Sequence, residues 1–118
     1  MITSKQKELI DRLLYITKEN KITWEKHVTP KSFVYKFEQV RYIVNSYKTS
    51  VENKEFDCFS LTIVNSQNGR LYENCVGCND TEYMEDFNEL KKLYNAVITQ
   101  YTKGDDREIG NLLKSLPV

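Results

Sequence analysis

The sequence has few of the residue types on which common enzyme sites depend. It holds a single histidine, His27, and four glycines, at positions 69, 77, 104 and 110. A nucleophilic triad needs a base beside its nucleophile, and no Gly-x-Ser-x-Gly segment accompanies His27. A phosphate cradle needs several glycines in one short loop, whereas these four are dispersed. We therefore expect no catalytic residues and no cofactor, which means a protein that is not an enzyme.

Long apolar runs are also missing. No segment approaches the roughly 20 apolar residues that cross a bilayer, and the start, Met1 to Lys7, lacks the apolar core of a signal peptide. Three cysteines, Cys58, Cys75 and Cys78, cannot all pair within one chain, which fits a reducing compartment. The length and the charged content suit one folded domain over residues 1–118. We expect a cytoplasmic protein that makes no membrane contact.

The clearest structural pattern runs from Phe56 to Val76. Apolar and polar residues alternate before Asn68-Gly69, the dipeptide most typical of a type I′ hairpin turn. A tight turn there predicts these pairs: Gln67 with Arg70, Ile63 with Asn74, and Leu61 with Val76. One face then carries Phe59, Leu61, Ile63, Tyr72 and Val76. A four-residue loop gives the same faces, whereas a three-residue bulged loop would flip one strand.

A second hairpin is predicted around Glu38-Gln39. A tight turn pairs large residues on one face, namely Phe37 with Val40, Tyr35 with Tyr42, and Phe33 with Val44. Lys36 and Arg41 then meet on the opposite face. The polar stretch from Tyr47 to Lys54 is predicted to be a mobile loop.

Helices are predicted at both ends of the chain. Thr3 and Gln6 form a capping box, and the helix after them ends near Asn20. Trp24 is expected to plug the end of the core. A long helix begins at a second capping box, Asn79 with Glu82, and Gly104 ends it. A last short helix then carries the apolar stripe Ile109, Leu112, Leu113 and Leu116.

These elements predict an α+β fold in the order α-β-β-β-β-α-α. The four strands form an antiparallel meander, and the helices cover its aromatic face because both need burial. The long helix carries a tyrosine-rich seam, which comprises Tyr83, Phe87, Leu90, Tyr94, Val97 and Tyr101. Since tyrosine is enriched at interfaces, we expect a twofold homodimer through this helix or through the exposed meander edge. In the alternative, the closing leucine helix covers the same strip.

The segment from Cys75 to Cys78 is the only one that resembles a catalytic motif. A Cys-x-x-Cys pair before a helix favours a thiolate, but Asp80, Glu82, Glu85 and Asp86 oppose it. Zinc needs four ligands, and Cys58 would supply only a third. The weak metal candidates are therefore Cys58, Cys75 and Cys78, and the simplest interpretation is three reduced thiols.

The balanced net charge hides an asymmetry between the two halves of the chain. Residues 1–54 hold eleven Lys or Arg and six Asp or Glu, and residues 55–118 hold six and eleven. Either the halves interleave in the fold, or the surface has a basic side that attracts an acidic partner. A nucleic-acid surface would use the basic residues Lys36, Arg41, Lys48 and Lys54 with Tyr42 and Tyr47. The near-neutral pI and the aromatic spacing argue against it.

The chain resembles small uncharacterised single-domain α+β proteins of bacteria and their phages. The resemblance is carried by Leu13-Leu14 with Thr17, Ile22-Thr23-Trp24, Leu61-Thr62-Ile63, Leu71-Tyr72 and the stretch from Leu90 to Tyr94. It implies an accessory protein that acts by binding.

The leading hypothesis is a non-enzymatic cytosolic interaction module with an inhibitory, immunity or regulatory role. The candidate partner-binding residues are Lys36, Arg41, Tyr83, Tyr94 and Tyr101. One alternative is a small nucleic-acid-binding regulator that uses the basic first half, and another is a cysteine-based metal or redox protein.

Overall fold

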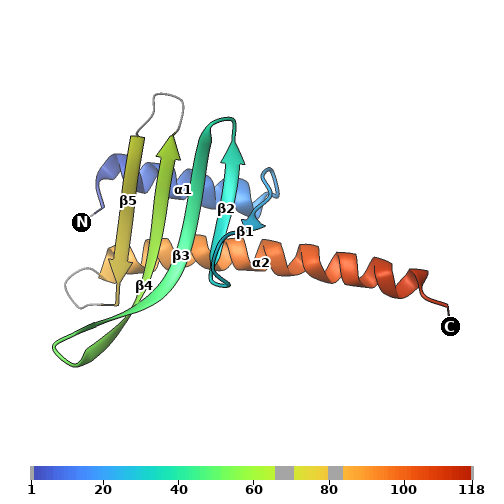
Figure 1. The fold of residues 1–118 in the computed structure, drawn as a ribbon. Helices are drawn as coiled ribbons and strands as arrows, with labels where there is room; N and C mark the ends of the chain where they lie inside the picture. Colours follow the sequence, from blue (N-terminus) through green and yellow to red (C-terminus); the bar gives the residue numbers. More distant parts are fainter. Residues whose placement is uncertain (1, 66–70, 80–83, 118) are drawn as a thin grey trace.

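The computed structural model describes residues 2–65, 71–79 and 84–117, and only the backbone of residues 71–74. It shows an antiparallel sheet of five strands in the order β1-β2-β3-β4-β5, with two helices on one face (Figure 1). The elements are α1 (Ser4–Lys18), β1 (Glu25–Lys26), β2 (Ser32–Phe37), β3 (Val40–Val51), β4 (Lys54–Asn65), β5 (Leu71–Cys78) and α2 (Met84–Ser115). The α+β class and the antiparallel meander are confirmed. The numbers of strands and helices differ from the prediction.

The core lies between the sheet and the two helices. Its buried members are Ile10, Leu13, Trp24, Phe33, Val44, Leu61, Ile63, Cys75, Leu90, Leu93, Tyr94 and Val97. Trp24 occupies the end of this core as predicted, and its indole Nε1–H donates a hydrogen bond to Thr17 Oγ1 at 3.0 Å. The core therefore depends on residues from nearly the whole length of the chain.

The β2–β3 hairpin has the predicted register. Phe33 lies opposite Val44, Tyr35 opposite Tyr42, and Lys36 opposite Arg41. The extra strand β1 comes from the connector after Trp24, where Glu25 and Lys26 pair with β2. A strand of two residues carries no alternating pattern, which explains why β1 was not predicted.

The predicted loop from Tyr47 to Lys54 is wrong. β3 continues to Val51 and β4 begins at Lys54, joined by a two-residue turn. The turn residues Glu52 and Asn53 have φ values of 51° and 67°, which is the pattern of a type I′ turn. The hairpin was not predicted because its turn begins with a glutamate, whereas Asn-Gly or Asp-Gly is the usual sequence of a type I′ turn.

The predicted β4–β5 register is wrong by one residue. Leu61 lies opposite Cys75 and Ile63 opposite Glu73, so Cys75 enters the core and Val76 lies on the other face, 37% exposed. The predicted pair of Gln67 with Arg70 lies outside the described residues. Gly77 supplies a physical reason, because a Cβ there would lie 2.6 Å from the α2 backbone at Phe87. Only glycine lets the helix approach the strand so closely.

Helix α2 is one continuous helix of 32 residues, which corrects the predicted stop at Gly104 and the separate closing helix. A glycine inside a helix costs only about 1 kcal/mol relative to alanine, so it weakens a helix without ending it. The predicted capping box of Asn79 with Glu82 falls partly outside the described residues.

Candidate protein-binding site

The last part of α2 continues past the β1 side of the sheet (Figure 1). We call residues 104–115 of the helix, together with Leu116 directly after it, the α2 extension. Four large aliphatic side chains are exposed on it: Ile109 by 53%, Leu112 by 64%, Leu113 by 65% and Leu116 by 60%. They do not cover the tyrosine strip, which corrects the alternative in which a closing helix folds back over it. A cluster of exposed aliphatic side chains on one element is typical of an interaction surface.

The same face of α2 lines a groove beside the sheet. Ile98, Thr102, Asp105 and Ile109 line it, and their alternating spacing of four and three residues puts them on one side of the helix. Leu112 and Leu116 continue that spacing. The groove, which we call the α2 groove, has a volume of about 570 Å³. One continuous helical face therefore runs from the groove onto the extension.

Aromatic rings form the floor of the α2 groove. The Phe33 ring lies 5.2 Å from the Tyr101 ring and 6.0 Å from the Tyr94 ring, measured between centroids. The Tyr94 hydroxyl donates a hydrogen bond to the carbonyl oxygen of Lys31 at 2.8 Å, and burial raises the pKa of this hydroxyl. The floor is therefore built from packed side chains.

The wall opposite α2 is basic. Lys26, Pro30 and Lys31, from β1 and the segment after it, line this side of the groove. The Lys26 ammonium lies 5.6 Å from the centroids of both the Phe33 and the Tyr101 ring, within the range of a cation–π interaction. An amphipathic helix could therefore lie in this groove, with its apolar side on the aromatic floor and its polar side toward solvent.

The five predicted partner-binding residues do not form one surface. Tyr94 is only 6% exposed and belongs to the core, and Tyr101 is half-buried against Phe33. Tyr83 lies outside the described residues. Lys36 and Arg41 are exposed and paired, but on the sheet face away from the helices. Tyr94 and Tyr101 therefore pack against the rest of the fold, whereas the exposed aliphatic side chains lie further along α2.

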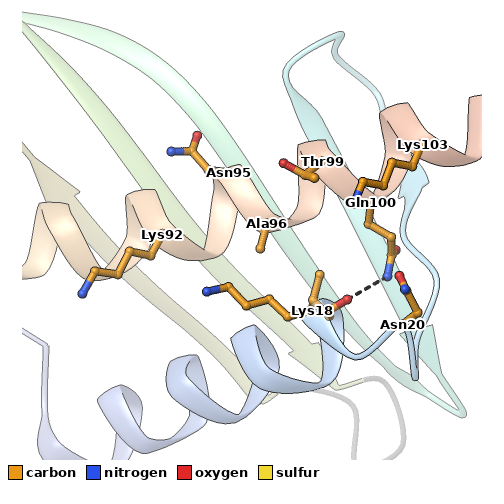
Figure 2. A pocket seen from close by; sticks show the side chains of 9 residues that line it. Lys18, Asn20, Lys92, Asn95, Ala96, Thr99, Gln100 and Lys103 are labelled. Atoms are coloured by element: carbon orange, nitrogen blue, oxygen red, sulfur yellow. Dashed lines mark hydrogen bonds between the residues drawn. The ribbon is translucent and has the colours of Figure 1, made fainter. Parts of the chain in front are cut away.

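A second groove lies between the end of α1 and the middle of α2 (Figure 2). It has a volume of about 370 Å³, and Lys18, Lys92 and Lys103 line it without any acidic residue among the described lining residues. The Gln100 amide is already engaged, since its Nε2 donates to Thr17 O and Ile22 O at 3.2 and 2.7 Å. Lys92 already pairs with Glu89 at 3.8 Å, so Lys18 and Lys103 are the groups that could attract an anion. The charge count by halves missed this groove because it combines residues from both.

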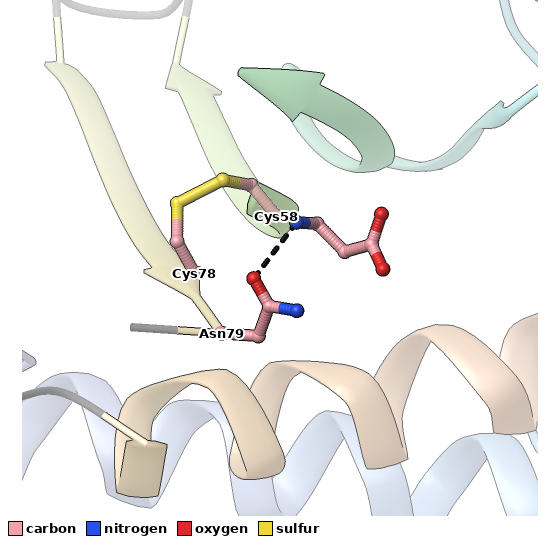
Figure 3. Close-up of a disulfide and its surroundings, with 4 residues drawn as sticks. Cys58, Cys78 and Asn79 are labelled. Carbon is pink, nitrogen blue, oxygen red and sulfur yellow. Dashed lines mark hydrogen bonds between the residues drawn. A yellow bond between two sulfur atoms is a disulfide. The ribbon is translucent and has the colours of Figure 1, made fainter. Parts of the chain in front are cut away.

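The prediction of three reduced thiols is wrong, because Cys58 and Cys78 form a disulfide (Figure 3). They lie opposite each other on β4 and β5. Asn79 continues the connection, since its N–H donates to Asp57 O and its Oδ1 accepts from the Asp57 N–H, both at 2.9 Å. Cys75 lies outside the disulfide, buried on the helix-covered face. The Cys-x-x-Cys segment therefore supplies no dithiol pair of its own.

The described part of the chain contains neither a cluster of metal-ligating side chains nor a membrane-spanning helix. Within residues 2–65, 71–79 and 84–117, no group of three His, Cys, Asp or Glu side chains is placed to hold a metal ion. Neither described helix is long and apolar enough to cross a membrane.

Comparison with known proteins identifies no relative. No family model matches the sequence, and no curated protein or solved structure matches it either.

Proposed function

We propose that the protein is a non-enzymatic interaction module that binds another protein through the α2 extension and the α2 groove. The observation that carries this proposal is the set of four aliphatic side chains, 53–65% exposed, in line with the groove. An accessory role, such as inhibition, immunity or regulation, fits a binding surface of this kind.

Physical reasoning supports a bound state for the extension. A helical segment of 12 or so residues is marginal in water on its own, and most helical stability in proteins comes from packing an apolar face. In the extension, Leu112, Leu113 and Leu116 form such a face beyond the residues that line the α2 groove. A partner that covers Leu112 and Leu113 would supply the missing packing, as in helix-in-groove recognition.

Affinity capture from the native cell tests the proposal. The wild-type chain should retain a protein that the variant Leu112→Glu/Leu113→Glu loses, because both side chains are exposed and the substitutions should leave the fold intact. Lys114→Glu is the matched control, since it reverses a charge on the opposite side of the same helical segment. Equal capture by all three proteins would contradict the proposed site.

A second candidate function is binding of nucleic acid or another polyanion, which the three-lysine groove favours. Single-stranded oligonucleotide binding should then weaken steeply with added salt and weaken further in Lys103→Glu, which reverses a charge that lines the groove. The control is Lys5→Glu, which removes a lysine paired with Glu8 at 3.8 Å elsewhere on α1. Binding that is absent at low salt would rule this candidate out.

A further inference from the structure

We infer that the partner of the α2 extension is a second copy of this chain, bound as an antiparallel helix pair around a twofold axis. This inference rests on the proposed function, because it names the partner of the same surface. It starts from the continuous face that runs along α2 from Ile98 to Leu113 and on to Leu116, which directly follows the last helical residue, Ser115.

This face is complementary to itself in the antiparallel direction. An axis beside residue 107 places large residue against large residue in two layers: Leu116 opposite Ile98, and Leu113 opposite Tyr101. It places Leu112 opposite Thr102 and Ile109 opposite Asp105. Each extension would then lie over the part of the partner's groove that is lined by the half-buried residues Ile98 and Tyr101. In a parallel pair, the exposed leucines would face one another and leave both grooves uncovered.

The length of the face suits a weak dimer. From Ile98 to Leu116 the face spans 18 residue steps, which at about 1.5 Å of rise each give roughly 27 Å of contact. One helix pair of that length is at the small end of specific interfaces. Near the axis, Asp105 and Asp106 of one copy approach those of the other, and like charges weaken such a pair. We therefore expect dissociation in the micromolar range.

Sedimentation equilibrium between about 1 and 200 µM tests the dimer. Wild type should change from monomer to dimer across this range. Leu113→Glu should remain monomeric, because it places a charge opposite Tyr101, and Lys114→Glu should dimerise like wild type. A wild-type monomer at the highest concentration, or a dimer that Leu113→Glu retains, would overturn the inference.

A second variant tests the direction of the pair. Asp105→Asn/Asp106→Asn removes four carboxylates near the axis, so the dimer should tighten several-fold. Unchanged or weaker association would overturn the antiparallel arrangement. If wild type stays monomeric while capture of a different protein still depends on Leu112 and Leu113, the second copy is excluded and the proposed function stands.

Discussion

At the residue scale, Leu61 shows how the β4–β5 register determines stability. Leu61 is fully buried between the sheet and the helices, so Leu61→Ala should lower the free energy of unfolding by about 2–5 kcal/mol. Val76 lies on the open face, and Val76→Ala should cost about 0.5 kcal/mol or less. Urea denaturation of both variants measures the difference. Equal losses would indicate the alternative register, in which Val76 lies opposite Leu61.

Tyr94 connects the core to the wall of the groove and makes stability depend on alkaline pH. Burial raises the pKa of its hydroxyl, so the folded state holds this proton more tightly than the unfolded chain does. Stability from this group is complete below the unfolded pKa of about 10 and falls as the pH rises above it. Tyr94→Phe should lower the free energy of unfolding by about 0.5–1.5 kcal/mol at neutral pH, because it removes the hydrogen bond to Lys31 O.

Chemical denaturation at pH 8 and pH 10.5 separates the two effects of Tyr94→Phe. The difference from wild type should shrink at the higher pH. Burial also raises the pKa of Tyr42. The Tyr94→Phe variant should therefore still lose some folding stability as the pH rises. A difference that grows with pH would contradict the role given to Tyr94.

At the element scale, Gly104 distinguishes one continuous helix from two. A Cβ at Gly104 would meet nothing within 4 Å, and α2 runs through it. Gly104→Ala should therefore increase helicity by circular dichroism and stabilise α2 by up to about 1 kcal/mol. If the chain turned here in a left-handed conformation, the same substitution would be destabilising.

Gly77→Ala is the control for Gly104→Ala. The added Cβ would lie 2.6 Å from the backbone of Asp86 and Phe87, so α2 must move away from β5. This variant should be clearly destabilised. A neutral effect would mean that the strand and the helix are not in close contact.

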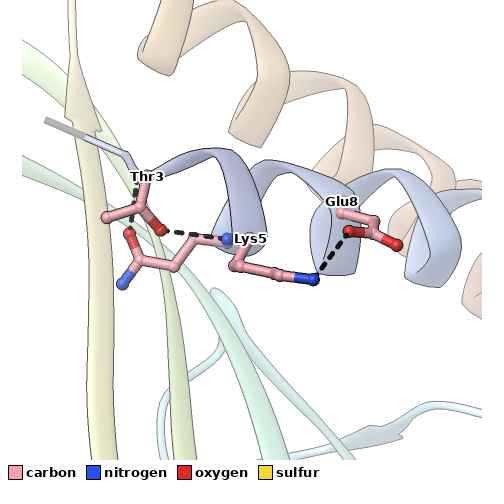
Figure 4. Close-up of polar contacts among 4 residues, drawn as sticks. Thr3, Lys5 and Glu8 are labelled. Atoms are coloured by element: carbon pink, nitrogen blue, oxygen red, sulfur yellow. Dashed lines mark hydrogen bonds and ion pairs between the residues drawn. The ribbon is translucent and has the colours of Figure 1, made fainter.

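Local patterns predicted the elements whose signals lie within a few residues. The Thr3 capping box is present, with Gln6 N–H donating to Thr3 Oγ1 at 3.1 Å and Thr3 N–H to Gln6 Oε1 at 2.9 Å (Figure 4). The end of α1 near Asn20 was also predictable: the helix ends at Lys18, and Asn20 follows with φ of 56°, because asparagine tolerates the left-handed conformation. Alternation of large residues likewise set the β2–β3 register.

Contacts between distant elements decided the rest. The β4–β5 register depends on Gly77 against α2, and β1 depends on β2. The leucine stripe of the extension had the spacing of a core helix, and sequence alone could not show that the sheet ends before it. The candidate site therefore lay in residues that had been identified correctly as apolar but placed in the wrong environment.

At the scale of the whole molecule, the two halves of the chain interleave. Lys18 lies in the same groove as Lys92 and Lys103, and Lys7 of α1 pairs with Glu85 of α2 at 3.8 Å. Opposite charges of the two halves thus approach each other in the fold, although this exposed pair contributes little to stability. The excess charge of each half therefore does not require a molecule with one basic and one acidic side.

The Cys58–Cys78 disulfide joins β5 to the rest of the sheet across a sequence separation of 20 residues. Closing a loop of that length restricts the unfolded chain and should stabilise the fold by about 3 kcal/mol. Thermal unfolding of wild type should therefore shift to lower temperature in a reductant, whereas Cys58→Ala/Cys78→Ala should unfold at the same temperature with and without it. A wild-type protein insensitive to reductant would contradict a stabilising disulfide.

Thiol counting extends the same test to the cell. Denatured, unreduced protein should expose one thiol, that of Cys75, which is buried and outside the disulfide in the folded chain. Protein whose thiols are alkylated at lysis of a reducing cytoplasm should show three thiols and the lower stability of the reduced form, because thiols are kept reduced there. A single thiol after alkylation would place the protein in an oxidising environment and contradict the cytoplasmic expectation. The outcome also sets the redox condition under which the α2 extension should be tested for binding.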